Sequence, residues 1–107
     1  MDSLTTGELA GRMKERPRLF RLIDVREKDE WDFCRLEGAE LFPLSEFPSR
    51  SLAELKKDDE IVLYCHHGVR SEHAGHFLLK NGFSRVSHLS GGIEAWSLEV
   101  DSSVKRY

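Results

Sequence analysis

The sequence is poor in cysteine and has no long apolar run. Its 107 residues contain only two cysteines, Cys34 and Cys65, which are too few for a disulfide-stabilised scaffold. No apolar run approaches the roughly 20 residues that a membrane-spanning helix needs. The first residues have neither the basic region nor the apolar stretch of a signal peptide. These features predict a cytoplasmic protein with reduced thiols and no membrane partner.

Positive charge is not in excess either. The chain carries 16 Lys and Arg against 19 Asp and Glu, a formal net charge of -3, and its basic residues are scattered. Nucleic-acid binding needs a basic face, so nucleic acid is not expected as a partner. Hydrophobic residues make up 39% of the chain, and no linker or repeat interrupts it. We therefore expect a single domain, residues 1–107, with one core.

Segments typical of helices and strands alternate along the chain. Thr5 and Glu8 have capping-box spacing, which predicts a helix through Leu9 that stops before Pro17. The other expected helices are residues 28–33, 45–57 (a broken or second helix that contains Pro48), 71–81 (with Gly82 as C-cap) and 93–96. The expected strands are residues 19–25, a brief one within 38–44, 61–65 and 86–89. This alternation predicts an α/β fold, a central and mainly parallel sheet flanked by helices on both faces.

Cys65 ends the most apolar of these segments, at the edge where parallel sheets bind ligands. A thiolate is the nucleophilic form of cysteine, and a helix N-terminus or a nearby cation favours it. Gly68 allows the loop to curl around the sulfur, and Arg70 offers a cation for an oxyanion. Ser71 is expected to cap the next helix and to donate toward the sulfur. A free cysteine is by itself more often a small buried hydrophobe, but this loop favours a nucleophile.

The loop also resembles a known family. Residues 65–71, Cys-His-His-Gly-Val-Arg-Ser, resemble the Cys-x-x-Gly-x-Arg-Ser/Thr active-site loop of rhodaneses. Further segments resemble other motifs of that family in the same order: residues 23–27, residues 35–39 with 42–44, and residues 89–96 with their Gly-Gly and Trp. The resemblance spans roughly residues 4–97, which makes that stretch the expected core and residues 98–107 a C-terminal tail.

The resemblance implies a sulfurtransferase that needs no metal and no organic cofactor. Cys65 would take a sulfane sulfur from a donor such as thiosulfate as a persulfide and pass it to cyanide or a thiol. The rest of the loop would bind the anionic donor: His66, His67, Gly68, Val69, Arg70 and Ser71. Asp24 and Arg26 match family positions to which we assign structural support. The expected partners are small-molecule sulfur donors and acceptors, or proteins in their place.

Two other functions stay open at this point. One is a phosphatase or arsenate reductase on the related fold, but those enzymes have a longer loop than the four residues between Cys65 and Arg70. The other is a non-enzymatic module that binds or relays sulfur, although such modules usually lack the cysteine. The presence of Cys65, Gly68 and Arg70 in one loop favours a catalytic function over a non-enzymatic module.

One departure from the resemblance lies beside the other thiol. Arg35 stands where many rhodaneses have His, and Cys34 precedes it. Cys34 could resolve a persulfide by forming a disulfide with Cys65, but we prefer to interpret it as a packing or surface residue.

The histidines His66, His67, His73 and His76 suggest a metal site, yet adjacent loop histidines rarely converge on one ion. We therefore expect no metal site.

Overall fold

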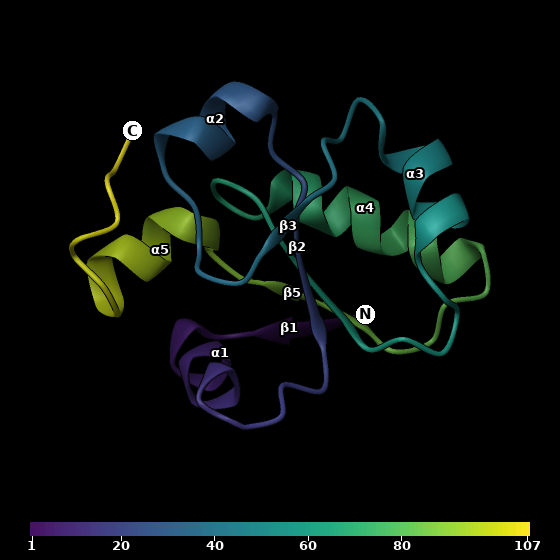
Figure 1. Cartoon of the computed structure of the whole chain (residues 1–107), viewed down its shortest axis with the longest axis horizontal. Helices are drawn as coiled ribbons and strands as arrows, with labels where there is room; N and C mark the ends of the chain where they lie inside the picture. Colours follow the sequence, from purple (N-terminus) through teal and green to yellow (C-terminus); the bar gives the residue numbers. More distant parts are fainter.

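Five parallel strands form a single sheet at the centre of the molecule (Figure 1). The computed structural model describes residues 1–107. The strands are β1 (Asp2–Leu4), β2 (Arg21–Asp24), β3 (Glu40–Leu41), β4 (Ile61–Tyr64) and β5 (Val86–Leu89), in the spatial order β1-β5-β4-β2-β3. The helices are α1 (Thr6–Met13), α2 (Lys28–Phe33), α3 (Phe47–Glu54), α4 (Val69–Lys80) and α5 (Gly92–Glu99). Every pair of strands is parallel, so all carboxyl ends meet at one edge of the sheet.

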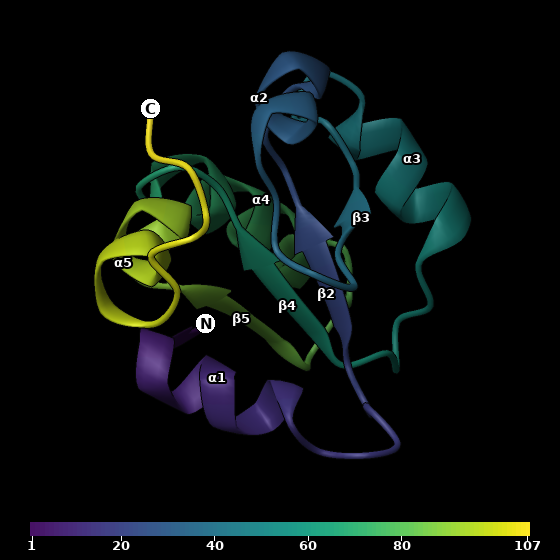
Figure 2. The same ribbon diagram turned by 60° about the vertical axis from the view of Figure 1, so that its left-hand side comes forward.

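Helices cover both faces of this sheet (Figure 2). Successive side chains of a strand point to opposite faces, so Val62 and Leu63 in the central strand β4 belong to different cores. Leu63 packs in the core that contains Phe47 of α3 and Leu78 of α4. Val62 packs in the core that contains Trp96 of α5 and the buried side of α1. The predicted fold class, a parallel sheet between two helical layers, is confirmed.

Most predicted elements are confirmed, because they depend on local signals. Helix α2 and strand β5 have their predicted bounds. The capping box at the start of α1 is present: the Glu8 amide donates to Thr5 Oγ1 (3.1 Å), and the Thr5 amide donates to Glu8 Oε1 (2.9 Å). Helix α5 continues to Glu99, beyond the predicted end at residue 96.

Three predictions were incomplete or wrong. Strand β1 was not predicted; it is short and mostly exposed, and it forms because its backbone pairs with β5. Helix α4 begins at Val69, two residues earlier than predicted, so Ser71 lies inside its first turn and does not cap it. The residue at the N-cap is Gly68 instead. At the other end Asn81 is the C-cap, and Gly82 follows it with φ 92°.

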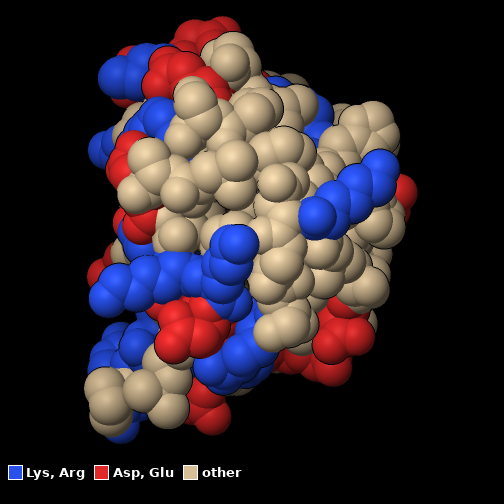
Figure 3. Space-filling model, turned by 90° about the vertical axis from the view of Figure 1, so that its right-hand side faces the viewer, with Lys and Arg blue, Asp and Glu red and all other residues tan.

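The surface carries charges of both signs. On the face shown in Figure 3, Lys and Arg side chains lie beside Asp and Glu side chains, with uncharged atoms between them. Ion pairs of the molecule include Arg50–Glu54 (2.9 Å) and Arg85–Glu60 (3.2 Å). None of the helices is both long enough and apolar enough to cross a membrane.

Candidate active site

Cys65 directly follows β4 and lies at the carboxyl edge of the sheet, with only 1% of its surface exposed. Its Sγ accepts the backbone N–H of Gly68 at 3.0 Å and that of Ser71 at 3.4 Å. The thiol also lies 3.7 Å from the Ser71 hydroxyl. Gly68 has φ 116°, a left-handed backbone that side chains rarely adopt, and this conformation turns the loop around the sulfur. The site is a ring of donors at the start of α4, which stabilises negative charge on sulfur.

The N-terminus of α5 supports this loop from behind. The Ile93 amide donates to the Cys65 carbonyl (2.9 Å), and the Glu94 amide donates to the His66 carbonyl (3.1 Å). Gly92 has φ 64°, and a Cβ at this position would collide with both of these carbonyl groups. Gly92 is therefore required by the close approach of the two backbones. This contact holds the loop from which the Cys65 sulfur projects.

Arg70 lies beside the loop and is held by Glu30 of α2. Its two terminal nitrogens donate to the two Glu30 oxygens at 2.7 and 2.8 Å. Glu30 also accepts the Tyr107 hydroxyl at 2.6 Å. These bonds, that of Arg70 foremost, lower the pKa of Glu30 to about 2. Glu30 is also the main cause that raises the pKa of Arg70. The guanidinium is thus held in place by Glu30 beside the loop.

Glu30→Gln is expected to destabilise the protein at neutral pH and much less in acid. The folded protein holds the pKa of Glu30 below its ordinary value of 4.5, so its contribution to stability is present above about pH 5 and is lost as the pH falls toward 2. Urea unfolding of both proteins between pH 7 and pH 2.5 measures this difference. In Glu37→Gln, which changes an exposed carboxylate, the difference should stay small at every pH. A Glu30→Gln effect that did not change with pH would contradict this assignment.

Three aromatic side chains form a stack over the loop. The His66 ring lies between the rings of His67 and Tyr107, with centroid distances of 3.9 and 3.8 Å. Phe33 of α2 meets the edge of the Tyr107 ring at 5.9 Å. The C-terminus accordingly lies beside α2 in Figure 1. The sequence assigned no role to residues 98–107, and Tyr107 is a site residue that it missed.

His66, His67 and Glu94 are the one group of side chains that could be considered for a metal ion. Their ligand atoms lie within 4.8 Å of one another. The two rings are stacked at 26°, however, so their nitrogen lone pairs do not converge on one point. Glu94 already accepts Arg106 Nε at 2.6 Å. His67 Nε2 lies 3.9 Å from Glu94 Oε2, and the buried His66 Nε2 has no hydrogen-bond partner. The geometry therefore does not favour an ion.

Asp24 and Arg26 form a fully buried ion pair, each 0% exposed. Arg26 donates from Nε and Nη2 to the Asp24 carboxylate at 3.0 and 2.7 Å. The same guanidinium donates to the Cys34 carbonyl (2.6 Å), the Glu30 carbonyl (3.3 Å) and the Tyr107 hydroxyl (3.0 Å). Burial opposes the charge, but the Asp24 carboxylate raises the pKa of Arg26. The pair joins the end of β2 to α2 and to the C-terminus.

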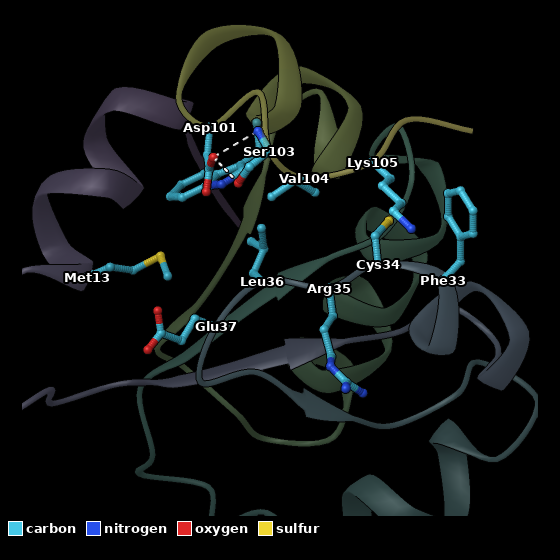
Figure 4. A pocket seen from close by; sticks show the side chains of 11 residues that line it. Met13, Phe33, Cys34, Arg35, Leu36, Glu37, Asp101, Ser103, Val104 and Lys105 are labelled. Atoms are coloured by element: carbon cyan, nitrogen blue, oxygen red, sulfur yellow. Dashed lines mark hydrogen bonds between the residues drawn. The ribbon is translucent and has the colours of Figure 1, made fainter.

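Cys34 lies apart from the loop. Both cysteines are free, and the Cys34 Sγ lies 3.7 Å from Arg26 Nη1. Cys34 lines a surface pocket of about 410 Å³ between residues 33–37 and the chain after α5, where Figure 4 shows its sulfur beside Lys105. No residue of the loop 65–71 lines that pocket. The sulfur of Cys65, by contrast, is enclosed by its own loop, so the two thiols face different surroundings.

The remaining predicted site residues differ in their exposure. Val69 begins α4 with its side chain 67% exposed, and it makes no bond to the sulfur. Arg35, which was not predicted as a site residue, has its guanidinium over the Trp31 ring at 4.8 Å. The structure thus brings together Cys65, Gly68 and Ser71 around the sulfur, with Arg70 at the side.

Comparison with known proteins identifies the family. The model of the rhodanese-like domain matches residues 5–99. The chain belongs to the rhodanese-like family. A rhodanese-like domain protein from Staphylococcus aureus has the same fold with a TM-score of 0.82 and 28% identity, over 100% of this chain and 99% of that one. The family resemblance predicted from the loop is therefore confirmed.

Curated relatives of this rhodanese-like domain include sulfurtransferases. The probable adenylyltransferase/sulfurtransferase MoeZ of Mycobacterium tuberculosis is 44% identical over 91 residues, which is 84% of this chain. The chain spans only 23% of the length of MoeZ. A sulfurtransferase of Allochromatium vinosum is 37% identical over 71% of this chain and 70% of its own length. These relatives support a role in sulfur transfer.

Proposed function

We propose that this rhodanese-like domain moves a sulfane sulfur from thiosulfate to cyanide or a thiol through a persulfide on Cys65. One observation supports this reaction above the others: the Cys65 Sγ accepts two backbone N–H groups at the N-terminus of α4. Such a pocket fits a thiolate and equally a persulfide anion, since both place negative charge on sulfur. In support of thiosulfate, the thiosulfate sulfurtransferase GlpE of Glaesserella parasuis is 33% identical over 70% of this chain.

The reaction takes place in two half-reactions. The Cys65 thiolate attacks the outer sulfur of thiosulfate; the new S–S bond forms, and the bond to the sulfonate sulfur breaks, releasing sulfite. An acceptor nucleophile then attacks the terminal sulfur of the persulfide, and Cys65 leaves as a thiolate. No electron is gained or lost overall, so the reaction requires no redox cofactor. The ping-pong order follows from the covalent intermediate.

Arg70 is the cation that binds the anionic donor in this proposal. Its side chain is 32% exposed, and Arg70 lies in the first turn of α4, next to the Ser71 amide that donates to the Cys65 Sγ. The bidentate bond to Glu30 fixes its orientation at the edge of the loop.

A protein could take the place of either small molecule. MoeZ combines adenylyltransferase and sulfurtransferase in its name, and YrkF of Bacillus subtilis, 37% identical over 71% of this chain, is named a putative sulfur carrier protein. We extend the proposal to a protein donor or acceptor on that ground. The two free thiols suit a reducing compartment such as the cytoplasm.

Mass spectrometry of the intact protein after incubation with thiosulfate tests the proposal. We expect a gain of one sulfur atom, mapped by peptide analysis to Cys65 and not to Cys34. Addition of cyanide should remove that mass and release an equal amount of thiocyanate. A protein that gains no sulfur, or gains it on Cys34, would contradict the proposed chemistry.

A further inference from the structure

A buried histidine connects Cys65 to the surface on the side of the sheet edge strand β1. His88 lies in β5 and is only 6% exposed. Its Nδ1 lies 3.0 Å from Ser71 Oγ, and that hydroxyl lies 3.7 Å from the Cys65 Sγ. On its other side, His88 Nε2 lies 3.3 Å from Ser3 Oγ. One line of hydrogen bonds therefore runs from the sulfur through Ser71 and His88 to Ser3.

The far end of this line is open to solvent. A surface pocket of about 270 Å³ is lined by eight residues: Ser3, His67, Gly68, Val69, Glu72, His88, Ser90 and Gly91. Almost all of the residues that line this pocket are polar or are glycines, so the pocket can hold water. The enclosed sulfur of Cys65 thus has a path for protons to this pocket that does not pass through Arg70.

Burial and nearby charges both affect the pKa of His88. Burial is the main cause that lowers the pKa of His88, and His76 and the amino group of Met1 lower it further. Glu72 on α4 acts in the opposite direction. A neutral imidazole has one nitrogen that accepts and one that donates, so Nδ1 accepts the Ser71 hydroxyl when Nε2 carries the proton. The Ser71 hydroxyl has a second acceptor, the Gly68 carbonyl at 3.0 Å.

We propose that His88 receives, through Ser71, the proton that the Cys65 thiol gives up when it becomes a nucleophile. This inference rests on the proposed function, in which Cys65 must be a thiolate. The S–H bond of Cys65 breaks and its proton passes to Ser71 Oγ, while the Ser71 proton passes to His88 Nδ1. Sulfur keeps the electron pair, the imidazolium faces the thiolate through Ser71, and Nε2–H donates to Ser3. His88 acts on the sulfur only through Ser71, so it is a positioning residue.

The pH dependence of Cys65 alkylation by iodoacetamide tests this relay. Peptide mass spectrometry gives the rate at Cys65 alone, from pH 5 to pH 10. His88→Asn keeps a polar group near the Nδ1 position but cannot take a proton. We expect it to slow alkylation at pH 7 by about 10²-fold and to move the midpoint of the profile to higher pH. His73→Asn, which changes an exposed histidine on α4, should match the wild type.

Ser71→Ala provides a second variant that does not alter β5. It removes the link, so its profile should shift as that of His88→Asn does, and the double variant should show no further shift. A purely structural His88 would lower the rate by the same factor at every pH and leave the midpoint in place. That result, or additive shifts in the double variant, would overturn the relay.

Failure of the relay and failure of the proposed function give different results. If the wild type gains sulfur on Cys65 and both variants keep its alkylation midpoint, the relay is wrong and the sulfur chemistry stands. If the variants shift the midpoint but the wild type gains no sulfur from thiosulfate, His88 still controls the ionisation of Cys65 and the proposed reaction is wrong.

Discussion

Cys65→Ser is expected to lose sulfur transfer, with turnover falling by about 10³-fold or more. A serine hydroxyl is not ionised near neutral pH and cannot hold the sulfane sulfur as a persulfide. The fold should persist, because an oxygen at this position still accepts the N–H groups of Gly68 and Ser71 that the sulfur accepts now. Thiocyanate formation from thiosulfate and cyanide measures the turnover, and thermal unfolding measures the fold.

Cys34→Ser is the matched control for this variant. Cys34 faces the pocket beside Lys105 and does not line the loop, so its loss should leave turnover within about two-fold of the wild type. Equal losses in the two variants would indicate a relay through both thiols and would contradict a single-cysteine mechanism. Substantial turnover in Cys65→Ser would exclude the persulfide altogether.

The fold was predictable where local signals are strong. The four apolar residues of β4 and the capping box at Thr5 specify their elements without reference to the rest of the chain. Strand β1 has no such signal, since two of its three residues are exposed and only the pairing with β5 makes it a strand. The early start of α4 was missed for a related reason. Gly68 adopts the N-cap position because the loop must turn around the sulfur, and this requirement is not visible in helix periodicity.

The site was predictable to the extent that its residues are close in sequence. Cys65, Gly68 and Ser71 lie within seven residues, so a strand followed by a loop and a helix is enough to bring their donors to the sulfur. The partners of Arg70 and Ser71 come from distant segments: Glu30 is 40 residues from Arg70, and His88 is 17 residues from Ser71. Tertiary packing alone decides these contacts. For the contact between His88 and Ser71, the only available signal was a histidine within a buried strand, because a buried polar side chain needs a hydrogen-bond partner.

Arg26→Met is expected to destabilise the protein by about 3–5 kcal/mol, the largest effect on stability that we predict. Methionine keeps much of the volume of arginine, but it leaves the fully buried Asp24 carboxylate without its cation. The carbonyl of Cys34 and the hydroxyl of Tyr107 lose a donor at the same time. Urea unfolding at pH 7 measures the free energy of unfolding of the variant and the wild type.

Arg50→Met is the control, because Arg50 also pairs with a carboxylate, Glu54, but on the exposed surface of α3. Its cost should stay below about 1 kcal/mol, since solvent screens such pairs. The double variant Asp24→Leu/Arg26→Met should recover part of the stability that Arg26→Met loses, because it removes the uncompensated charge as well as its partner. Should Arg26→Met prove no more costly than Arg50→Met, the buried pair would not brace the site. Failure of the double variant to recover stability would instead mean that Arg26 acts mainly through its bonds to Cys34 and Tyr107.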